Sequence, residues 1–257
     1  MLNNSISRKS EDFPDPENQK FSRKTKEQKF LIFDSSTIIS LSLSDLLFIL
    51  EEIKKNSPEI KLIVSKDIIN EIVNKPLTIK RFKLEALMVK NLLEKNIIEP
   101  ATNYVSEEEL EKGTDDILNI SDRLFRAKNE NIQIMHRGEI SCIALYKILK
   151  KKNEKVLLIV DERTTRMLCE NPTNLHKLLQ IKLHTDVNYD YEAGDFFKGI
   201  NIIRSSELCS FAFKKKIIRL PGSKIESLDA VLYALKFHGC SISGEEIEEE
   251  KQIFSKI

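Results

Sequence analysis

Residues 30–34 read Phe-Leu-Ile-Phe-Asp, a short apolar run that ends in a carboxylate. Consecutive apolar residues are typical of a strand that is buried on both faces, as in a parallel sheet covered by helices. Residues 61–64 (Lys-Leu-Ile-Val) and 156–160 (Val-Leu-Leu-Ile-Val) have the same character, and the latter run is directly followed by Asp161. The sequence therefore predicts buried strands at these three places. Shorter candidates lie at 97–98 and 201–204.

The stretches between these strands carry apolar residues at every third or fourth position, which is typical of amphipathic helices. Ser44 is expected to cap the first predicted helix, and Pro76 to end the second. Because strands that alternate with helices form right-handed crossovers, we predict a three-layer α/β/α domain with a mainly parallel central sheet of four to five strands. The predicted helices cover residues 44–55, 67–73, 78–95, 106–111, 114–129, 138–151, 224–237 and 243–255.

The chain of 257 residues suffices for one large α/β domain or for a domain with a small appendage. Residues 1–28 are polar and show no periodicity, so we expect a flexible N-terminal tail ahead of a single domain at 29–257. Two stretches, near 101–137 and 171–198, are interpreted as insertions in that domain because they interrupt the alternation of strands and helices.

Composition limits the classes of function. The net charge of +1 argues against indiscriminate coating of nucleic acid but allows a local basic groove. No apolar run approaches the roughly 18 residues of a membrane span, and the first 30 residues lack the apolar core of a secretory signal. We therefore expect a cytoplasmic location and no membrane partner. The four cysteines lack zinc or redox spacing, which favours inert buried roles.

Acidic residues follow two of the predicted strands at the point where each ends. Asp34 follows the first strand and Asp161 follows the strand at 156–160. Glu71 lies on the short helix after the second strand, and Glu139 begins the helix at 138–151, so both could reach the same edge of the sheet. Clustered carboxylates repel one another unless a hard cation binds them, and Mg²⁺ and Mn²⁺ prefer oxygen ligands. Glu162 could add a further oxygen, directly or through water.

Each of these acids has a plainer interpretation as well. An aspartate after a strand is often only the N-cap of the next helix. Arg137, Arg163 and Arg166 flank the acids and could hold the phosphates of a substrate. Solvation at the surface, or ion pairs with Glu139 or Glu162, would explain the same arginines equally well.

Four segments, taken together in this order, resemble the conserved regions of PIN-like metal-dependent ribonucleases of prokaryotic and archaeal type. They are residues 30–39 (Phe-Leu-Ile-Phe-Asp-Ser-Ser-Thr-Ile-Ile), 62–71, 137–145 (Arg-Gly-Glu-Ile-Ser-Cys-Ile-Ala-Leu) and 157–166. Residues 229–247 are similar to the C-terminal region of several prokaryotic members. The resemblance spans residues 30–170 and much of 200–250.

The resemblance implies a PIN-like fold and a divalent-metal-dependent endoribonuclease that hydrolyses the phosphodiester bonds of RNA, in particular single-stranded RNA. By position it implies that Asp34, Glu71, Glu139 and Asp161 coordinate Mg²⁺ or Mn²⁺ and are catalytic, with Glu162 as a further metal ligand. The chain departs from the family in two respects. Glu162 stands where the family often has a second aspartate, and the segments at 101–137 and 171–198 are long.

Other functions remain open at this point. The chain could be a catalytically silent PIN-like scaffold that binds RNA or a protein partner. Asp34-Ser-Ser also resembles the nucleophile region of haloacid-dehalogenase-like phosphatases, but Ser36 stands where those enzymes carry a second aspartate. PIN relatives include toxins neutralised by small antitoxins, so an antitoxin-like inhibitor and a homodimer are both compatible with the resemblance.

Overall fold

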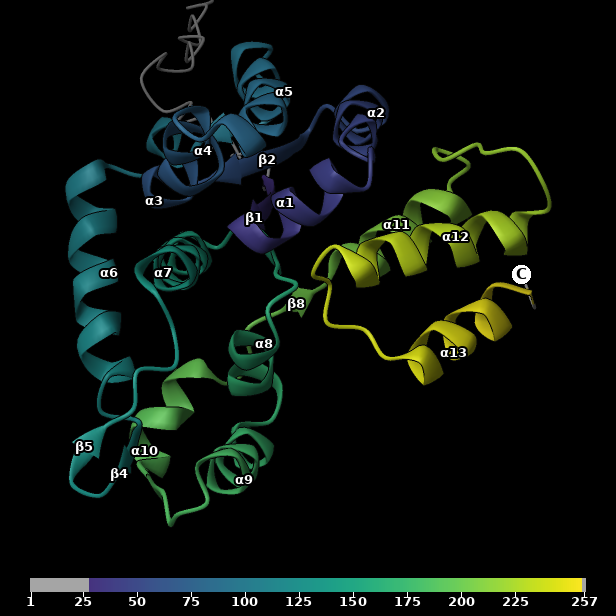
Figure 1. Ribbon diagram of the computed structural model, residues 1–257. Helices are drawn as coiled ribbons and strands as arrows, with labels where there is room; N and C mark the ends of the chain where they lie inside the picture. Colours follow the sequence, from purple (N-terminus) through teal and green to yellow (C-terminus); the bar gives the residue numbers. More distant parts are fainter. Residues whose placement is uncertain (1–27, 256–257) are drawn as a thin grey trace, which may run out of the picture.

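The computed structural model describes residues 28–255 and is built around a five-stranded sheet in which every strand pair is parallel (Figure 1). The predicted three-layer α/β/α fold with a mainly parallel sheet is confirmed. The predicted flexible tail at 1–28 lies, except for Gln28, outside the described residues. The strand order is β3-β2-β1-β6-β8. These strands are β1 (Lys29–Phe33), β2 (Ile60–Val64), β3 (Glu99–Pro100), β6 (Lys155–Ile159) and β8 (Ile202–Ile203).

Helices cover both faces of this sheet. On one face α7 (Arg137–Lys151) packs against β1 and β6, and α6 (Glu107–Ser121) packs along α7. On the other face α2 (Phe48–Asn56) packs against β2, and α11 (Ser205–Lys214) packs against α1 (Ser35–Leu43) and α2, as Figure 1 shows. The remaining helices are α3 (Lys66–Ile69), α4 (Lys75–Leu77), α5 (Lys83–Glu94), α8 (Arg163–Glu170), α9 (Pro172–Leu183), α10 (Tyr191–Gly194), α12 (Lys224–Phe237) and α13 (Gly244–Ser255).

The chain changes direction across the sheet between β1 and β6. It runs from β1 to β2 and β3 on one side, and then continues through β6 and β8 on the other. The connections that follow β1 and β6 run in opposite directions across the sheet. A crevice therefore forms beyond the carboxyl ends of these two strands, and this is the place where open α/β sheets bind ligands. Phe33 pairs with Ile159, and the backbone N–H of Asp34 donates to the Ile159 carbonyl oxygen at 3.0 Å. The ends of the two strands are therefore fixed side by side.

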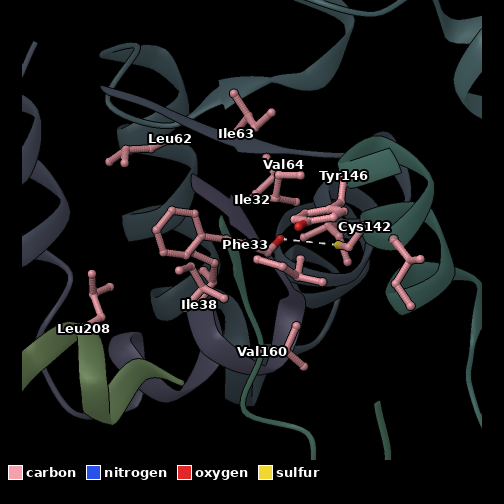
Figure 2. Close-up of a cluster of buried hydrophobic side chains, with 14 of the residues drawn as sticks. Ile32, Phe33, Ile38, Leu62, Ile63, Val64, Cys142, Tyr146, Val160 and Leu208 are labelled. Carbon is pink, nitrogen blue, oxygen red and sulfur yellow. Dashed lines mark hydrogen bonds between the residues drawn. The ribbon is translucent and has the colours of Figure 1, made fainter. Parts of the chain in front are cut away.

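The core beneath this crevice is apolar. Figure 2 shows Ile32, Phe33, Val64 and Val160 clustered with residues of α7. Cys142 lies among them and its thiol donates to the Phe33 carbonyl oxygen, with 3.7 Å between sulfur and oxygen. Because burial also raises the pKa of this thiol, Cys142 behaves as a packed hydrophobe. The four cysteines are all free and buried.

A second, smaller sheet joins the two predicted insertions. It consists of β4 (Phe125–Ala127), β5 (Glu130–Asn131) and β7 (Asn188–Tyr189), with antiparallel pairs in the order β5-β4-β7. Phe125 stacks on Tyr189 with 4.8 Å between the ring centroids. The small sheet therefore connects the segments 101–137 and 171–198, which lie apart in the chain.

Several element boundaries differ from the sequence expectation. Ser44 ends α1, and α2 begins only at Phe48, so the predicted cap at Ser44 was wrong. The helix α1 escaped prediction because its hydroxyl-rich sequence is buried on several sides and shows no polar face. Pro76 lies within α4, which directly continues the π-helical turn Asn70–Asn74, so the helical segment runs one residue past Pro76 and ends at Leu77. The two helices predicted at 106–129 are one helix, α6, followed by a hairpin.

A search of residues 28–255 for helices long and apolar enough to cross a membrane found none.

Candidate functional site

Asp34 occupies the end of β1 and caps the N-terminus of α1. The backbone N–H and the hydroxyl of Ser36 both donate to Asp34 Oδ2, at 3.1 and 2.5 Å. The other carboxylate oxygen, Oδ1, is buried and has no hydrogen-bond partner among the described residues. Burial raises the pKa of the Asp34 carboxyl to about 6, and the hydrogen bonds from Ser36 limit that rise. A buried oxygen without a partner is costly, which marks a place where a cation or a donor is missing.

Glu71 reaches the same crevice from the segment after β2. It lies in a single π-helical turn (Asn70–Asn74) between α3 and α4, and such turns are frequent at functional sites. Its carboxylate lies against the backbone of Gly138, because a Cβ placed on Gly138 would stand 2.7 Å from Glu71 Oε1. The absence of a side chain at Gly138 therefore makes room for the Glu71 carboxylate at the start of α7.

Glu139 and Glu162 complete the group from two helix N-termini. Glu139 is the third residue of α7, and its Oε2 accepts from the backbone N–H of His136 in a capping box. Glu162 caps α8, and its Oε2 accepts from the Thr165 backbone N–H at 2.6 Å. Each of these carboxylates therefore keeps one oxygen that no described residue engages.

Electrostatics tie the four acids together. Burial, and after it the negative charges of Asp34, Glu162 and Glu71, together raise the pKa of the Glu139 carboxyl to about 8, against the lowering effect of the His136 hydrogen bond. Glu71 also contributes to the raised pKa of Asp34. Mutual repulsion of this kind requires that the carboxylates lie near one another without a compensating cation. Four of the five predicted metal ligands, Asp34, Glu71, Glu139 and Glu162, therefore lie close enough for their charges to interact.

Asp161 does not share this group, in contrast to the sequence expectation. Its side chain is fully buried, and its two oxygens accept from the backbone N–H and the hydroxyl of Ser205, both at 2.7 Å. Burial raises the pKa of the Asp161 carboxyl, and these bonds oppose the rise. Asp161 therefore anchors the first residue of α11 beside β6. The reason is a long-range partner, since Ser205 supplies a donor to each of the two Asp161 oxygens.

The three predicted substrate-binding arginines have different surroundings. Arg137 is committed to acids of neighbouring helices, at 2.6 Å from Asp115 and 3.6 Å from Asp67. Arg166 bonds to Ser241 and Glu170, but its Nε is buried without a partner among the described residues. Arg163 is exposed, and no hydrogen bond or ion pair to it occurs within the described part of the chain.

Arg163 and Arg166 share a polar groove of about 470 Å³ next to Glu162. Ser241, Ser243 and Glu246 form its other wall, and Glu246 is paired with Arg204 at 2.8 Å. Because Arg163 has no ion-pair partner among the described residues and directly follows Glu162 in the chain, the groove offers a positive charge close to one of the four carboxylates. This arrangement suits a phosphate group near the acids.

The four carboxylates fit a hard divalent cation in donor type and charge. They supply only oxygen atoms, the pKa values of Asp34 and Glu139 are raised, and Asp34 Oδ1 is a buried acceptor without a donor among the described residues. Within residues 28–255 no three His, Cys, Asp or Glu side chains are already arranged as ligands of one ion. The fit therefore concerns the chemistry of the donors, and Asp34, Glu71, Glu139 and Glu162 are the residues that would supply them.

Comparisons with protein-family models, with curated proteins and with solved structures found no match for this chain. The resemblance to PIN-like nucleases consequently stays a prediction from sequence motifs, and the function has to be argued from the site itself.

Proposed function

We propose that this chain is a divalent-metal-dependent endoribonuclease whose acidic site lies between the ends of β1 and β6. One observation carries the proposal. Carboxylates from four separate elements lie close enough for their charges to interact at the switch point of a parallel sheet, and the pKa values of two of them, Asp34 and Glu139, are raised. Carboxylates that lie close together without a cation repel one another and destabilise the fold. Their presence at one place therefore indicates a functional site.

Asp34, Glu71, Glu139 and Glu162 would hold Mg²⁺ or Mn²⁺. A divalent ion bound there supplies charge neutralisation for a phosphate and lowers the pKa of water. The chain itself orients the ligands. Ser36 fixes the rotamer of Asp34, and the two helix caps at His136 and Thr165 hold Glu139 and Glu162.

Arg163 and Arg166 would contact the RNA backbone on one side of the acids. Arg163 is exposed and unpaired within the described residues, so it can reach a phosphate without breaking an existing bond. Arg137 is left out of this role because Asp115 and Asp67 already engage it. A cytoplasmic location, where RNA is abundant, goes with this proposal.

The direct test is cleavage of a single-stranded RNA, labelled at one end, by the purified protein with Mn²⁺ or Mg²⁺. We expect internal cleavage that an excess of chelator abolishes and that added Mn²⁺ restores. A protein that binds the RNA but leaves it intact with every divalent ion tried would be a silent scaffold, contrary to the proposal.

Cation binding should depend on pH. In the metal-free protein the raised pKa values of Glu139 (about 8) and Asp34 (about 6) mean that the folded state binds more protons than the unfolded state between about pH 4 and pH 8. Its stability should therefore fall as the pH rises through this window. Mn²⁺ competes with these protons, so its stabilising effect should be larger at pH 8 than at pH 6.

Differential scanning fluorimetry at pH 6 and pH 8, with and without about 1 mM Mn²⁺, measures the rise in melting temperature that the ion causes at each pH. Ca²⁺-free buffers and a chelated control isolate the metal effect. An equal rise in melting temperature at pH 6 and pH 8 would show that the ion binds somewhere other than these carboxylates.

Gly138→Ala should disturb the site while leaving the fold intact. The new Cβ would stand 2.7 Å from Glu71 Oε1, and the flexible end of Glu71 can move away at little cost. We therefore expect an unchanged melting temperature without metal, and Mn²⁺ affinity and cleavage lower by about tenfold, as for other changes that misplace a ligand.

Gly113→Ala is the matched control for this substitution. Gly113 lies in the interior of α6, where an added Cβ would meet Ile148 Cδ1 at an ordinary 3.5 Å. Titration of both variants with Mn²⁺, followed by fluorimetry, compares them directly. Equal Mn²⁺ responses of the two alanine variants would remove Glu71 from the proposed ligand set.

A further inference from the structure

An apolar groove of about 320 Å³ lies beside the acidic site, between α1 and α5. Pockets of about 300–1,000 Å³ are typical of ligand sites. Several large side chains along it are exposed, among them Ile39 (41%), Ile79 (45%) and Phe82 (40%). The groove is lined by Ile38, Ile39, Ser42, Leu43, Glu71, Ile72, Lys75, Pro76, Ile79, Phe82, Glu85, Ala86 and Val89.

The groove is continuous with the proposed catalytic group through Glu71, which lines it and also belongs to the four carboxylates. A second acid, Glu85 of α5, lines the groove as well, and its Oε2 is buried without a hydrogen-bond partner among the described residues. The walls are thus apolar, with two carboxylates that can accept hydrogen bonds from an N–H donor.

The rim of the groove is basic. Residues 75–83 read Lys-Pro-Leu-Thr-Ile-Lys-Arg-Phe-Lys, and the cations of this segment are all exposed. Lys75, Lys80 and Lys83 have no acidic partner among the described residues, and the Arg81 guanidinium only stacks over Phe82, 5.4 Å from the ring centroid. Other exposed cations of the chain are paired with acids, for example Lys66 with Glu107 and Arg137 with Asp115.

We propose that this groove takes a base of the single-stranded RNA substrate, while the basic rim binds the phosphates that flank it. The inference rests on the proposed function, because it places the strand so that it runs past Glu71 into the carboxylate group. A flat aromatic base suits the apolar walls and can stack on Phe82, and its N–H groups can reach Glu85. Unpaired cations along the rim match a polyanion, which is why RNA is favoured over an apolar peptide helix.

Binding of RNA, measured without catalysis, tests this placement. The wild type is compared with Lys80→Glu/Arg81→Glu by fluorescence anisotropy of a labelled single-stranded RNA in the presence of chelator. We expect at least about tenfold weaker binding for the double variant, and a shallower salt dependence by about 1.4 in the logarithmic slope, since each lost phosphate contact removes about 0.7.

Lys177→Glu/Lys182→Glu is the matched control, because it makes the same change in charge on the exposed surface of α9. This variant should bind within about twofold of the wild type. Equal losses in the two double variants, or no loss in either, would overturn the placement, since RNA would then not distinguish the rim from other basic surface.

Cross-linking of the unmodified wild type provides a second measurement that no folding defect can obscure. RNA containing 4-thiouridine is irradiated on the protein, and the attached peptides are mapped by mass spectrometry. Cross-links within residues 79–83 or 38–43 support the groove, whereas cross-links found only elsewhere refute it. If the groove binds RNA but Mn²⁺ yields no cleavage, the proposed endoribonuclease fails and the RNA site stands.

Discussion

Replacing Asp34 with Asn is expected to lower the rate of RNA cleavage by at least about 100-fold without unfolding the protein. Asparagine retains an oxygen that accepts from Ser36, so the cap of α1 survives. The substitution removes a buried carboxylate. Its pKa is raised to about 6, and its Oδ1 has no hydrogen-bond partner among the described residues. The melting temperature of the metal-free variant should therefore equal or exceed that of the wild type.

Cleavage rates of Asp34→Asn and wild type at saturating Mn²⁺, together with their melting curves, measure both effects. Asp122→Asn serves as the matched control, because Asp122 also has a buried unpartnered Oδ1 but lies at the C-terminus of α6, outside the acidic group. It should cleave like the wild type. Unimpaired cleavage by Asp34→Asn would remove the acidic site from the reaction.

Asp161→Ala should have the largest effect on stability. The substitution removes a fully buried carboxylate and leaves the backbone N–H and the hydroxyl of Ser205 without an acceptor. Loss of a buried hydrogen-bonded partner, with the cavity that follows, costs about 2–4 kcal/mol in the free energy of unfolding. Because α11 packs against α1 and α2, the weakened anchor also loosens the layer above the site.

Urea unfolding of Asp161→Ala and Asp161→Asn separates an anchoring role from a metal-binding role. Asparagine keeps one acceptor for Ser205, so we expect it to lose less stability than alanine and to retain most of the cleavage activity. An Asp161→Asn variant that folds like the wild type but no longer cleaves RNA would return Asp161 to the ligand set that the sequence predicted.

The contrast between Asp161 and Glu162 shows what the sequence could and could not predict. A buried strand that ends in two acids indicates a site, and the order of strands and helices was enough to expect Asp34, Glu71 and Glu139 at one edge. Which of the two neighbouring acids faces the crevice depends on a donor in α11, 44 residues further along the chain. Local pattern carries no information about such a partner.

The segment at 75–83 escaped the sequence interpretation for a related reason. Lys80, Arg81 and Lys83 were included in a longer predicted helix at 78–95, where alternating charges usually form a solvated face. In the structure Lys80–Phe82 forms a separate 3-10 turn before α5 begins at Lys83. That break places Ile79 and Phe82 along a groove that only the packing of α1 beside α5 creates. The sequence Lys-Arg-Phe-Lys at residues 80–83, which combines three cations with an aromatic ring, was the feature from which a basic groove could have been predicted.

The small antiparallel sheet has a consequence for the history of the chain. β4 and β7 come from two separate segments and satisfy each other's backbone hydrogen bonds, so losing one would expose the edge of the other. Neither segment could then be shortened independently at low cost. Homologous chains should consequently carry both additions or lack both, a co-occurrence that genome sequences can reveal.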